Sequence, residues 1–235
     1  MSVIAQNLQA VRARIAQAAR AVSRDPHEVT LLAVSKTFSA EDVGEAMAAG
    51  QTAFGENYLQ EALDKMAAVR SMFPHAPISW HFIGPIQSNK TRPIAEHFDW
   101  VHSVDREKIA QRLSDQRPDH LPPLNVCVQV NVSQEASKSG AGTEEAAIIA
   151  RAVAEMPRLR LRGLMAIPEP TDDVMQQRAA FRQLRELYEA LHADGLPLDT
   201  LSMGMSGDLE AAIAEGATIV RVGTAIFGAR EYAKP

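Results

Sequence analysis

A lysine and a glycine–threonine pair each stand just after an apolar segment, and the two segments are far apart in the chain. Lys36 comes shortly after the apolar residues 31–34, and Gly223 and Thr224 follow the apolar residues 219–222. If both segments are strands of one parallel barrel, these residues meet at the same mouth, because the carboxyl ends of parallel strands share one end of a barrel. An amine would then face a backbone that can hold an anion.

This pairing of an amine with an anion cradle suits pyridoxal 5′-phosphate (PLP). A lysine takes the aldehyde of PLP as a Schiff base, and backbone amides hold its phosphate. Partial desolvation at a strand end would disfavour the charged form of Lys36 and make its amine more nucleophilic. The alternative is a lysine at the barrel rim whose charged end reaches solvent. Lys90 and Lys138, in the expected loops after the third and fifth strands, are weaker candidates for this role or for a second PLP site.

Two further polar residues belong to the same region. Ser206 precedes a helix that should open at Leu209, and we predict that its hydroxyl caps this helix while the free amides behind it face the phosphate. Arg221 has the same strand parity as Gly223, which places it inside the barrel beneath the ligand. Buried arginine is rare unless it is paired or liganded, so we predict that Arg221 faces the pyridine nitrogen and keeps it unprotonated. The alternatives are a simple helix cap at Ser206 and an interior salt bridge at Arg221.

Other chemistry has little support in the sequence. His81 and His102 lie inside apolar strands, where hydrogen-bonded core histidines are commoner than catalysts, and we assign neither a proton-transfer role. No Cys/His cluster has zinc spacing and no Gly-x-Ser-x-Gly elbow is present, so we expect no metal site and no catalytic residue. The single cysteine, Cys127, is expected to be a small buried core residue.

The order of the predicted elements indicates a barrel. A helix is predicted near the N-terminus, where Ile4, Leu8, Val11 and Ile15 recur at helical spacing. Strands then alternate with helices, which indicates βαβ units and parallel pairing. Eight strands favour a single α/β domain over residues 1–235, a (β/α)8 TIM barrel with an extra N-terminal helix, over an open doubly wound sheet. The predicted strands are 29–35, 52–56, 78–84, 100–104, 124–132, 159–167, 200–205 and 218–223.

The composition limits the binding partners and the cellular location that we expect for this protein. The formal charge of −5 and the aromatic content of 5% do not indicate a basic, base-stacking surface, so we expect no binding to nucleic acid. No stretch reaches eighteen apolar residues, and the N-terminal residues do not form a secretory signal, so no membrane association is expected. A lone cysteine cannot form an internal disulfide, which fits a reducing cytosol, and we expect a cytoplasmic protein.

Taken together, the motifs resemble those of the pyridoxal phosphate homeostasis proteins of the YggS/PROSC type. Any one segment is weakly specific, whereas the ordered set, which runs from the first strand to the C-terminus, is highly specific. The segments that carry the resemblance are 33–36 (AVSK), 54–58 (FGENY), 80–84 (WHFIG), 87–90 (QSNK), 102–105 (HSVD), 163–165 (GLM), 202–206 (SMGMS) and 221–228 (RVGTAIFG).

The resemblance implies an alanine-racemase-like barrel that binds PLP and lacks the racemases' extra domain. By motif, Lys36 would be the Schiff-base lysine, Arg221 would face the ring nitrogen, and Asn57 would lie at the pocket mouth. The residues that would hold the phosphate are Ser206, Gly223 and Thr224.

Two functions compete on this site. The first is a PLP carrier without catalytic turnover, which buffers the reactive aldehyde and helps supply apo-enzymes that depend on PLP. The second is an amino-acid racemase, which needs an acid and a base on opposite faces of the α-carbon. In the racemases the extra domain of the other subunit supplies the opposing tyrosine, and of Tyr58, Tyr188 and Tyr232 only Tyr58 follows a strand end. We therefore favour a monomeric carrier. A Schiff-base aldolase is weaker still, because the sixth strand contains no lysine.

Overall fold

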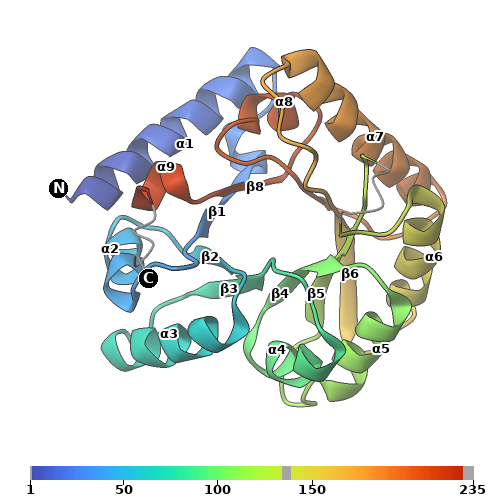
Figure 1. Cartoon of the computed structure of the whole chain (residues 1–235), viewed down its shortest axis with the longest axis horizontal. Helices are drawn as coiled ribbons and strands as arrows, with labels where there is room; N and C mark the ends of the chain where they lie inside the picture. The colour runs from blue at the N-terminus through green and yellow to red at the C-terminus, as the bar shows by residue number, and fades with distance from the viewer. Residues whose placement is uncertain (1, 134–138, 230–235) are drawn as a thin grey trace, which may run out of the picture.

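Eight parallel strands close into a barrel in which each strand lies beside its neighbours in the sequence (Figure 1). The computed structural model describes residues 2–133 and 139–229. β1 pairs with β8, through Thr30 opposite Ile219 and Ala33 opposite Val222, and this pairing closes the barrel and rules out an open doubly wound sheet. The predicted (β/α)8 barrel is therefore confirmed. The strands are β1 (Thr30–Val34), β2 (Ala53–Glu56), β3 (Ser79–Phe82), β4 (Trp100–Val104), β5 (Leu124–Gln129), β6 (Leu159–Met165), β7 (Thr200–Ser202) and β8 (Ile219–Val222).

Helices surround the barrel and connect its strands. Asp42 and Ser39 form a capping box at the start of α2, in which each side chain accepts a hydrogen bond from the other residue's backbone amide. The connecting helices are α2 (Ala40–Ala48), α3 (Leu59–Met72), α4 (Thr91–His97), α5 (Glu107–Gln116), α6 (Thr143–Ala154), α7 (Val174–Ala193) and α8 (Leu209–Ala214), with α9 (Thr224–Phe227) after β8 and short 3-10 turns at η1 (Pro26–Glu28) and η2 (Ser88–Lys90).

The predicted N-terminal helix is α1 (Val3–Ala21), which precedes the barrel and lies along its outside beside α8 and α9 (Figure 1). The apolar residues Ile4, Leu8, Val11 and Ile15 of α1 are buried against the barrel, as their helical spacing predicts. The helix thereby covers the region where β8 meets β1, which is the part of the barrel that carries the predicted lysine and phosphate residues.

Some predicted strands end earlier in the structure than in the sequence pattern. The seventh was predicted to reach residue 205, but β7 stops at Ser202 because Gly204 has a φ of +95° and turns the chain. A Cβ at Gly204 would lie 2.5 Å from the Cβ of Ala212, so this turn requires glycine. Residues 203–206 therefore form a loop at the mouth of the barrel.

Most of the buried side chains are apolar. Cys127 is buried and unbonded, and burial raises the pKa of its thiol to about 12, which confirms it as a core residue. Within residues 2–133 and 139–229, none of the helices combines the length and the apolar character that crossing a bilayer requires.

Candidate functional site

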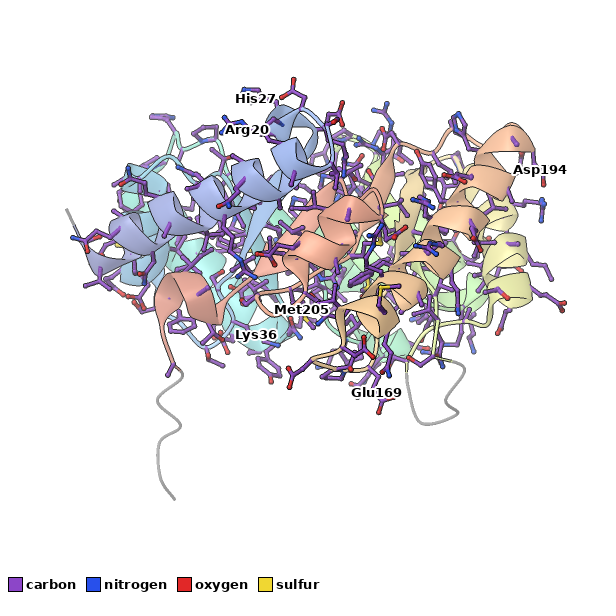
Figure 2. All side chains as sticks on the ribbon, turned by 90° about the horizontal axis from the view of Figure 1, so that it is seen from above. Arg20, His27, Lys36, Glu169, Asp194 and Met205 are labelled. Carbon is purple, nitrogen blue, oxygen red and sulfur yellow. The ribbon has the colours of Figure 1, made fainter. Side chains whose placement is uncertain are left out.

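Lys36 lies at the end of the barrel where the strands point their carboxyl ends. Figure 2 shows Lys36 and Met205 near one edge of the molecule, whereas Arg20 and His27 lie at the opposite edge. Lys36 is half-buried, two residues beyond the end of β1. The lysine therefore stands where the sequence predicted, at the mouth rather than inside the core.

The backbone beside Lys36 is held in an unusual conformation. Thr37 has a φ of +69°, a left-handed value that a β-branched residue rarely adopts. Its amide donates a hydrogen bond of 2.6 Å to the Oε1 atom of Glu61 in α3. This contact with a neighbouring helix fixes the direction in which the chain leaves Lys36.

A second, buried lysine lies behind the Lys36 segment. The Nζ atom of Lys65 donates to the carbonyl oxygen of Ser35 at 2.6 Å, to Glu56 Oε1 at 2.7 Å and to Glu61 Oε1 at 3.0 Å. The hydroxyl of Ser35 donates to the same Glu56 oxygen at 2.6 Å. Burial raises the pKa of the Glu56 carboxyl, and Lys65 opposes this effect. The sequence analysis missed this pair, although a glutamate inside the apolar 53–56 segment was a signal that it needed a partner.

The loop after β7 contains the predicted phosphate residue Ser206. Its backbone carbonyl accepts a hydrogen bond of 2.8 Å from Arg14 Nη1 of α1, and its side chain is half-buried. Ser206 does not cap α8, contrary to our prediction. Asp208 is the residue before the helix, and its Oδ1 atom accepts a hydrogen bond of 2.6 Å from the Met205 amide. Asp208 therefore bonds within the loop and precedes the helix, and the Ser206 hydroxyl does not cap α8.

The chain after β8 approaches the end of β1 closely. A Cβ at Gly223 would lie 3.1 Å from the carbonyl oxygen of Val34, so a larger residue would push these strand ends apart. Thr224 is exposed and begins α9. The backbone amides of Gly207, Thr224 and Ala225 have no hydrogen-bond acceptor within the described part of the chain. The two loops thus present donors suited to a phosphate group.

Arg221 lies inside the barrel, as the strand parity predicts. It is 4% exposed and donates to the Ser202 hydroxyl oxygen at 2.8 Å and to the Ala166 carbonyl oxygen at 2.9 Å. No carboxylate forms a salt bridge with it among the described residues. Burial lowers the pKa of its guanidinium to about 10, so it remains charged at neutral pH. Asp208 is the nearby carboxylate whose charge favours the charged form of Arg221, but it makes no direct ion pair with the guanidinium among the described residues. A buried cation in this setting fits a site that receives an acceptor atom from a ligand.

Asn57 lies two strands away from Arg221 around the barrel, beyond the end of β2. Its Oδ1 atom is buried and has no hydrogen-bond partner within the described residues, which leaves it available to a bound group. Its backbone is held by an unusually close contact, because a Cβ at Gly84 would lie only 2.3 Å from the Asn57 carbonyl oxygen. Glycine at position 84 is therefore required for the position of Asn57.

The structure places the predicted site residues on or just after four strands that are adjacent in the barrel, β7, β8, β1 and β2. Lys90 stands apart from them: it is exposed and belongs to η2, after β3. Lys138 lies outside the described residues. His81 and His102 are buried and hydrogen-bonded, which confirms them as core residues. Within the described part of the chain, no group of three or more His, Cys, Asp and Glu side chains could hold a metal ion.

Comparison with known proteins first defines the class. Residues 6–231 match the family described as the alanine racemase N-terminal domain. The alanine racemase of Corynebacterium glutamicum shares this fold, with a TM-score of 0.65 at 17% identity, and the match covers 99% of this chain and 62% of that one. The closed barrel and the polar residues at its mouth thus define an alanine-racemase-type barrel.

More similar relatives narrow this class. The chain is 66% identical over 235 residues to the pyridoxal phosphate homeostasis protein of Pseudomonas aeruginosa, covering 100% of this chain and 99% of the relative, and 55% identical over 234 residues to that of Escherichia coli K12, covering 100% of both. It belongs to the pyridoxal phosphate homeostasis protein family. The structure of PipY from Synechococcus elongatus with PLP bound has a TM-score of 0.82 at 36% identity, covering 96% of this chain and 100% of that one. The predicted family resemblance is confirmed.

Proposed function

We propose that this protein binds PLP reversibly through Lys36 and acts in PLP homeostasis as a carrier without catalytic turnover. The observation that carries the proposal is the meeting of the β1 and β8 ends. There the Lys36 amine lies at the same mouth as the unpaired amides of Thr224 and Ala225. Membership of the family and the PLP-bound structure of PipY support the same ligand.

The residues of the site fit the parts of PLP. Ser206, Gly223 and Thr224 would hold the phosphate through a hydroxyl and backbone amides. The buried charge of Arg221 would face the ring nitrogen, and the Oδ1 atom of Asn57, which has no hydrogen-bond partner among the described residues, would contact the cofactor at the mouth. When bound, PLP supplies an aldehyde that exchanges between amines. The protein's part is to orient this aldehyde toward Lys36 and to keep an arginine, rather than a carboxylic acid, beside the ring.

The alternative is an amino-acid racemase, and the tyrosines argue against it. Racemisation needs a second proton-transfer group opposite Lys36. Tyr58 is 53% exposed at the start of α3, and the hydroxyl of Tyr188 donates to the carbonyl oxygen of Leu198 at 3.0 Å. Tyr232 lies outside the described residues. His81 and His102 are buried below the mouth, and burial lowers the pKa of each ring. Neither ring is therefore suited to be the second proton-transfer group.

The decisive experiment is the visible absorption spectrum with added PLP, recorded before and after borohydride reduction. The wild-type protein should show an absorption band of PLP bound as a Schiff base, and borohydride should make this attachment permanent. Lys36→Ala should lack the band, whereas Lys90→Ala should keep it. A band of full size in Lys36→Ala would contradict the assignment of Lys36. If the protein exchanged the α-proton of a free amino acid, and Lys36→Ala did not, the racemase would be the better proposal than the carrier.

Supply of PLP to apo-enzymes is a separate part of the proposal. Loaded protein mixed with an apo-enzyme should restore its activity, and a scavenger of free PLP should not abolish this transfer if delivery involves contact. Complete loss of transfer with the scavenger would reduce the role to buffering. Sedimentation of the loaded and unloaded protein would test the expected monomer.

A further inference from the structure

A row of polar side chains crosses the apolar interior of the barrel from Arg221. The Nη1 atom of Arg221 lies 2.8 Å from the Ser202 hydroxyl oxygen, which lies 2.7 Å from Nδ1 of His102. The Nε2 atom of His102 lies 2.8 Å from Nδ1 of His81, and the Nε2 atom of His81 lies 3.0 Å from the hydroxyl oxygen of Ser79. These five residues, which we call the interior chain, come from β8, β7, β4 and β3.

The donors of the interior chain all point the same way. Arg221 can only donate, so the Ser202 oxygen accepts from it. In the donor order that keeps each proton within the interior chain, Ser202 then donates to Nδ1 of His102. A neutral His102 then carries its proton on Nε2 and donates to Nδ1 of His81. By the same reasoning, His81 carries its proton on Nε2 and donates to Ser79. In this donor order both histidines carry the proton on Nε2, whereas the reverse order would require the Ser202 oxygen to accept from both Arg221 and His102.

The surroundings of both rings favour the neutral form that this ordering needs. Burial lowers the pKa of His81 to about 3 and lowers that of His102 well below its usual value, and the charge of Arg221 adds to the second shift. The His81 ring also stacks on Trp100, with 5.2 Å between ring centroids and an angle of 6° between planes. The charged group that faces Trp100 is Arg162, with its guanidinium 4.4 Å from the ring centroid. Arg162 is itself paired with Asp199, with Nη2 2.8 Å from Oδ2, so burial is what disfavours a positive charge on His81.

The two ends of the interior chain reach different parts of the barrel. Arg221 lies toward the mouth, two residues before Gly223. Ser79 is the first residue of β3 and, with His81, lines a cavity of about 580 Å³ bounded by the first residues of several strands. The interior chain thus runs from the end of the barrel that would bind the ligand to the opposite end.

We propose that Ser202 and His102 are positioning residues, which hold the Arg221 guanidinium toward the ring nitrogen of PLP through the donor order of the interior chain. This inference rests on the proposed function for its effect on PLP, whereas the donor order is a property of the protein alone. Ser202 supplies the acceptor for one guanidinium nitrogen, and His102 fixes the direction of the Ser202 hydroxyl. Arg221 would otherwise have an unsatisfied donor in an apolar barrel or turn away from the ligand.

The first test is nitrogen-15 NMR of the histidine rings in the protein without PLP. At pH 7 both His81 and His102 should be neutral, with the proton on Nε2 and with Nδ1 shifts typical of hydrogen-bond acceptors. The exposed His97 serves as the reference ring outside the interior chain. A proton on Nδ1 of His102, or a charged ring, would overturn the donor order whether or not the protein binds PLP.

The second test measures the consequence for PLP. In Ser202→Ala the absorption of bound PLP should change its pH dependence and the affinity for PLP should fall about tenfold, whereas Ser202→Thr, which retains a hydroxyl, should restore both. Ser114→Ala is a matched control, because this serine is also buried but lies in α5, outside the interior chain and apart from the predicted PLP residues. Wild-type spectrum and affinity in a folded Ser202→Ala would overturn the positioning role. If the wild-type protein did not bind PLP through Lys36, the proposed function itself would be overturned.

Discussion

The guanidinium of Arg14 donates a hydrogen bond of 2.8 Å from Nη1 to the backbone carbonyl oxygen of Ser206, which ties α1 to the predicted phosphate loop. Glu210 in α8 holds the same arginine, with its Oε2 atom 2.6 Å from Nη2. Earlier in α1, the side-chain amide of Asn7 donates to the Ile226 carbonyl oxygen at 2.9 Å. The N-terminal helix therefore holds both loops that would bind the phosphate, although it contributes no strand to the barrel.

We expect Arg14→Ala to weaken the binding of PLP but not that of pyridoxal, which has no phosphate. Loss of a partly exposed hydrogen bond of about 1 kcal/mol corresponds to an affinity about fivefold lower. The matched control is Arg20→Ala, an exposed arginine of the same helix at the opposite edge of the molecule (Figure 2). Spectroscopic titration with both ligands gives the ratio, and equal losses for PLP and pyridoxal would contradict a role in holding the phosphate loop.

We expect Lys65→Met to destabilise the fold by about 3–5 kcal/mol, because it leaves the buried Glu56 carboxylate without its cation. The ion pair is almost inaccessible, with side chains 4% and 0% exposed. The double variant Lys65→Met/Glu56→Leu should recover most of this loss in urea unfolding. Lys90→Ala, which removes an exposed lysine, should change the unfolding free energy by less than about 0.5 kcal/mol. A double variant no more stable than the single one would show that the pair is not the cause.

We expect the fold to lose stability as the pH falls below about 6.5, the pKa of histidine in an unfolded chain. The folded-state pKa of His81 is lowered to about 3 and that of His102 is also lowered, so in this range the unfolded chain binds protons that the folded protein does not. Stability is therefore full above pH 6.5 and decreases toward pH 3, by up to about 1.4 kcal/mol per pH unit for each ring.

Urea unfolding at pH 7, 6, 5 and 4 measures this slope. The variant His81→Gln/His102→Gln should flatten it, even if the variant is less stable at pH 7. The control is His97→Gln at an exposed position, which leaves both buried rings in place and should retain the slope that they cause. An equally steep slope in the double variant would assign the acid sensitivity to other groups.

We expect Gly84→Ala to destabilise the fold by about 1–3 kcal/mol and to disturb Asn57. The added Cβ would lie 2.3 Å from a backbone oxygen of Asn57, which cannot move as a flexible side chain would. In contrast, a Cβ at Gly142 meets nothing within 4 Å, so Gly142→Ala should cost under about 1 kcal/mol. Thermal unfolding and PLP titration of both variants test this, and a tolerated Gly84→Ala would remove the constraint on Asn57.

Much of the fold and part of the site could be predicted from local patterns. The alternation of apolar strands and helices predicts an eight-stranded barrel, and the rule that parallel strands share one mouth brings Lys36 to Gly223 and Thr224. Strand parity likewise placed Arg221 inside the barrel. The prediction that Ser206 caps α8 was wrong, because Asp208 is the residue before the helix and its carboxylate accepts from the Met205 amide.

The contacts between distant residues required the tertiary structure. Arg14 and Ser206 are separated by 192 positions, and His102 and Ser202 by 100. No periodicity or capping pattern relates residues so far apart, because their contact depends on barrel closure and on how α1 packs outside it. The sequence by itself determined the barrel, its mouth and the identity of the amine there, through periods of two and 3.6 residues. Only the tertiary structure decided which buried polar groups satisfy one another, because each needs a partner and the fold determines which partner is within reach.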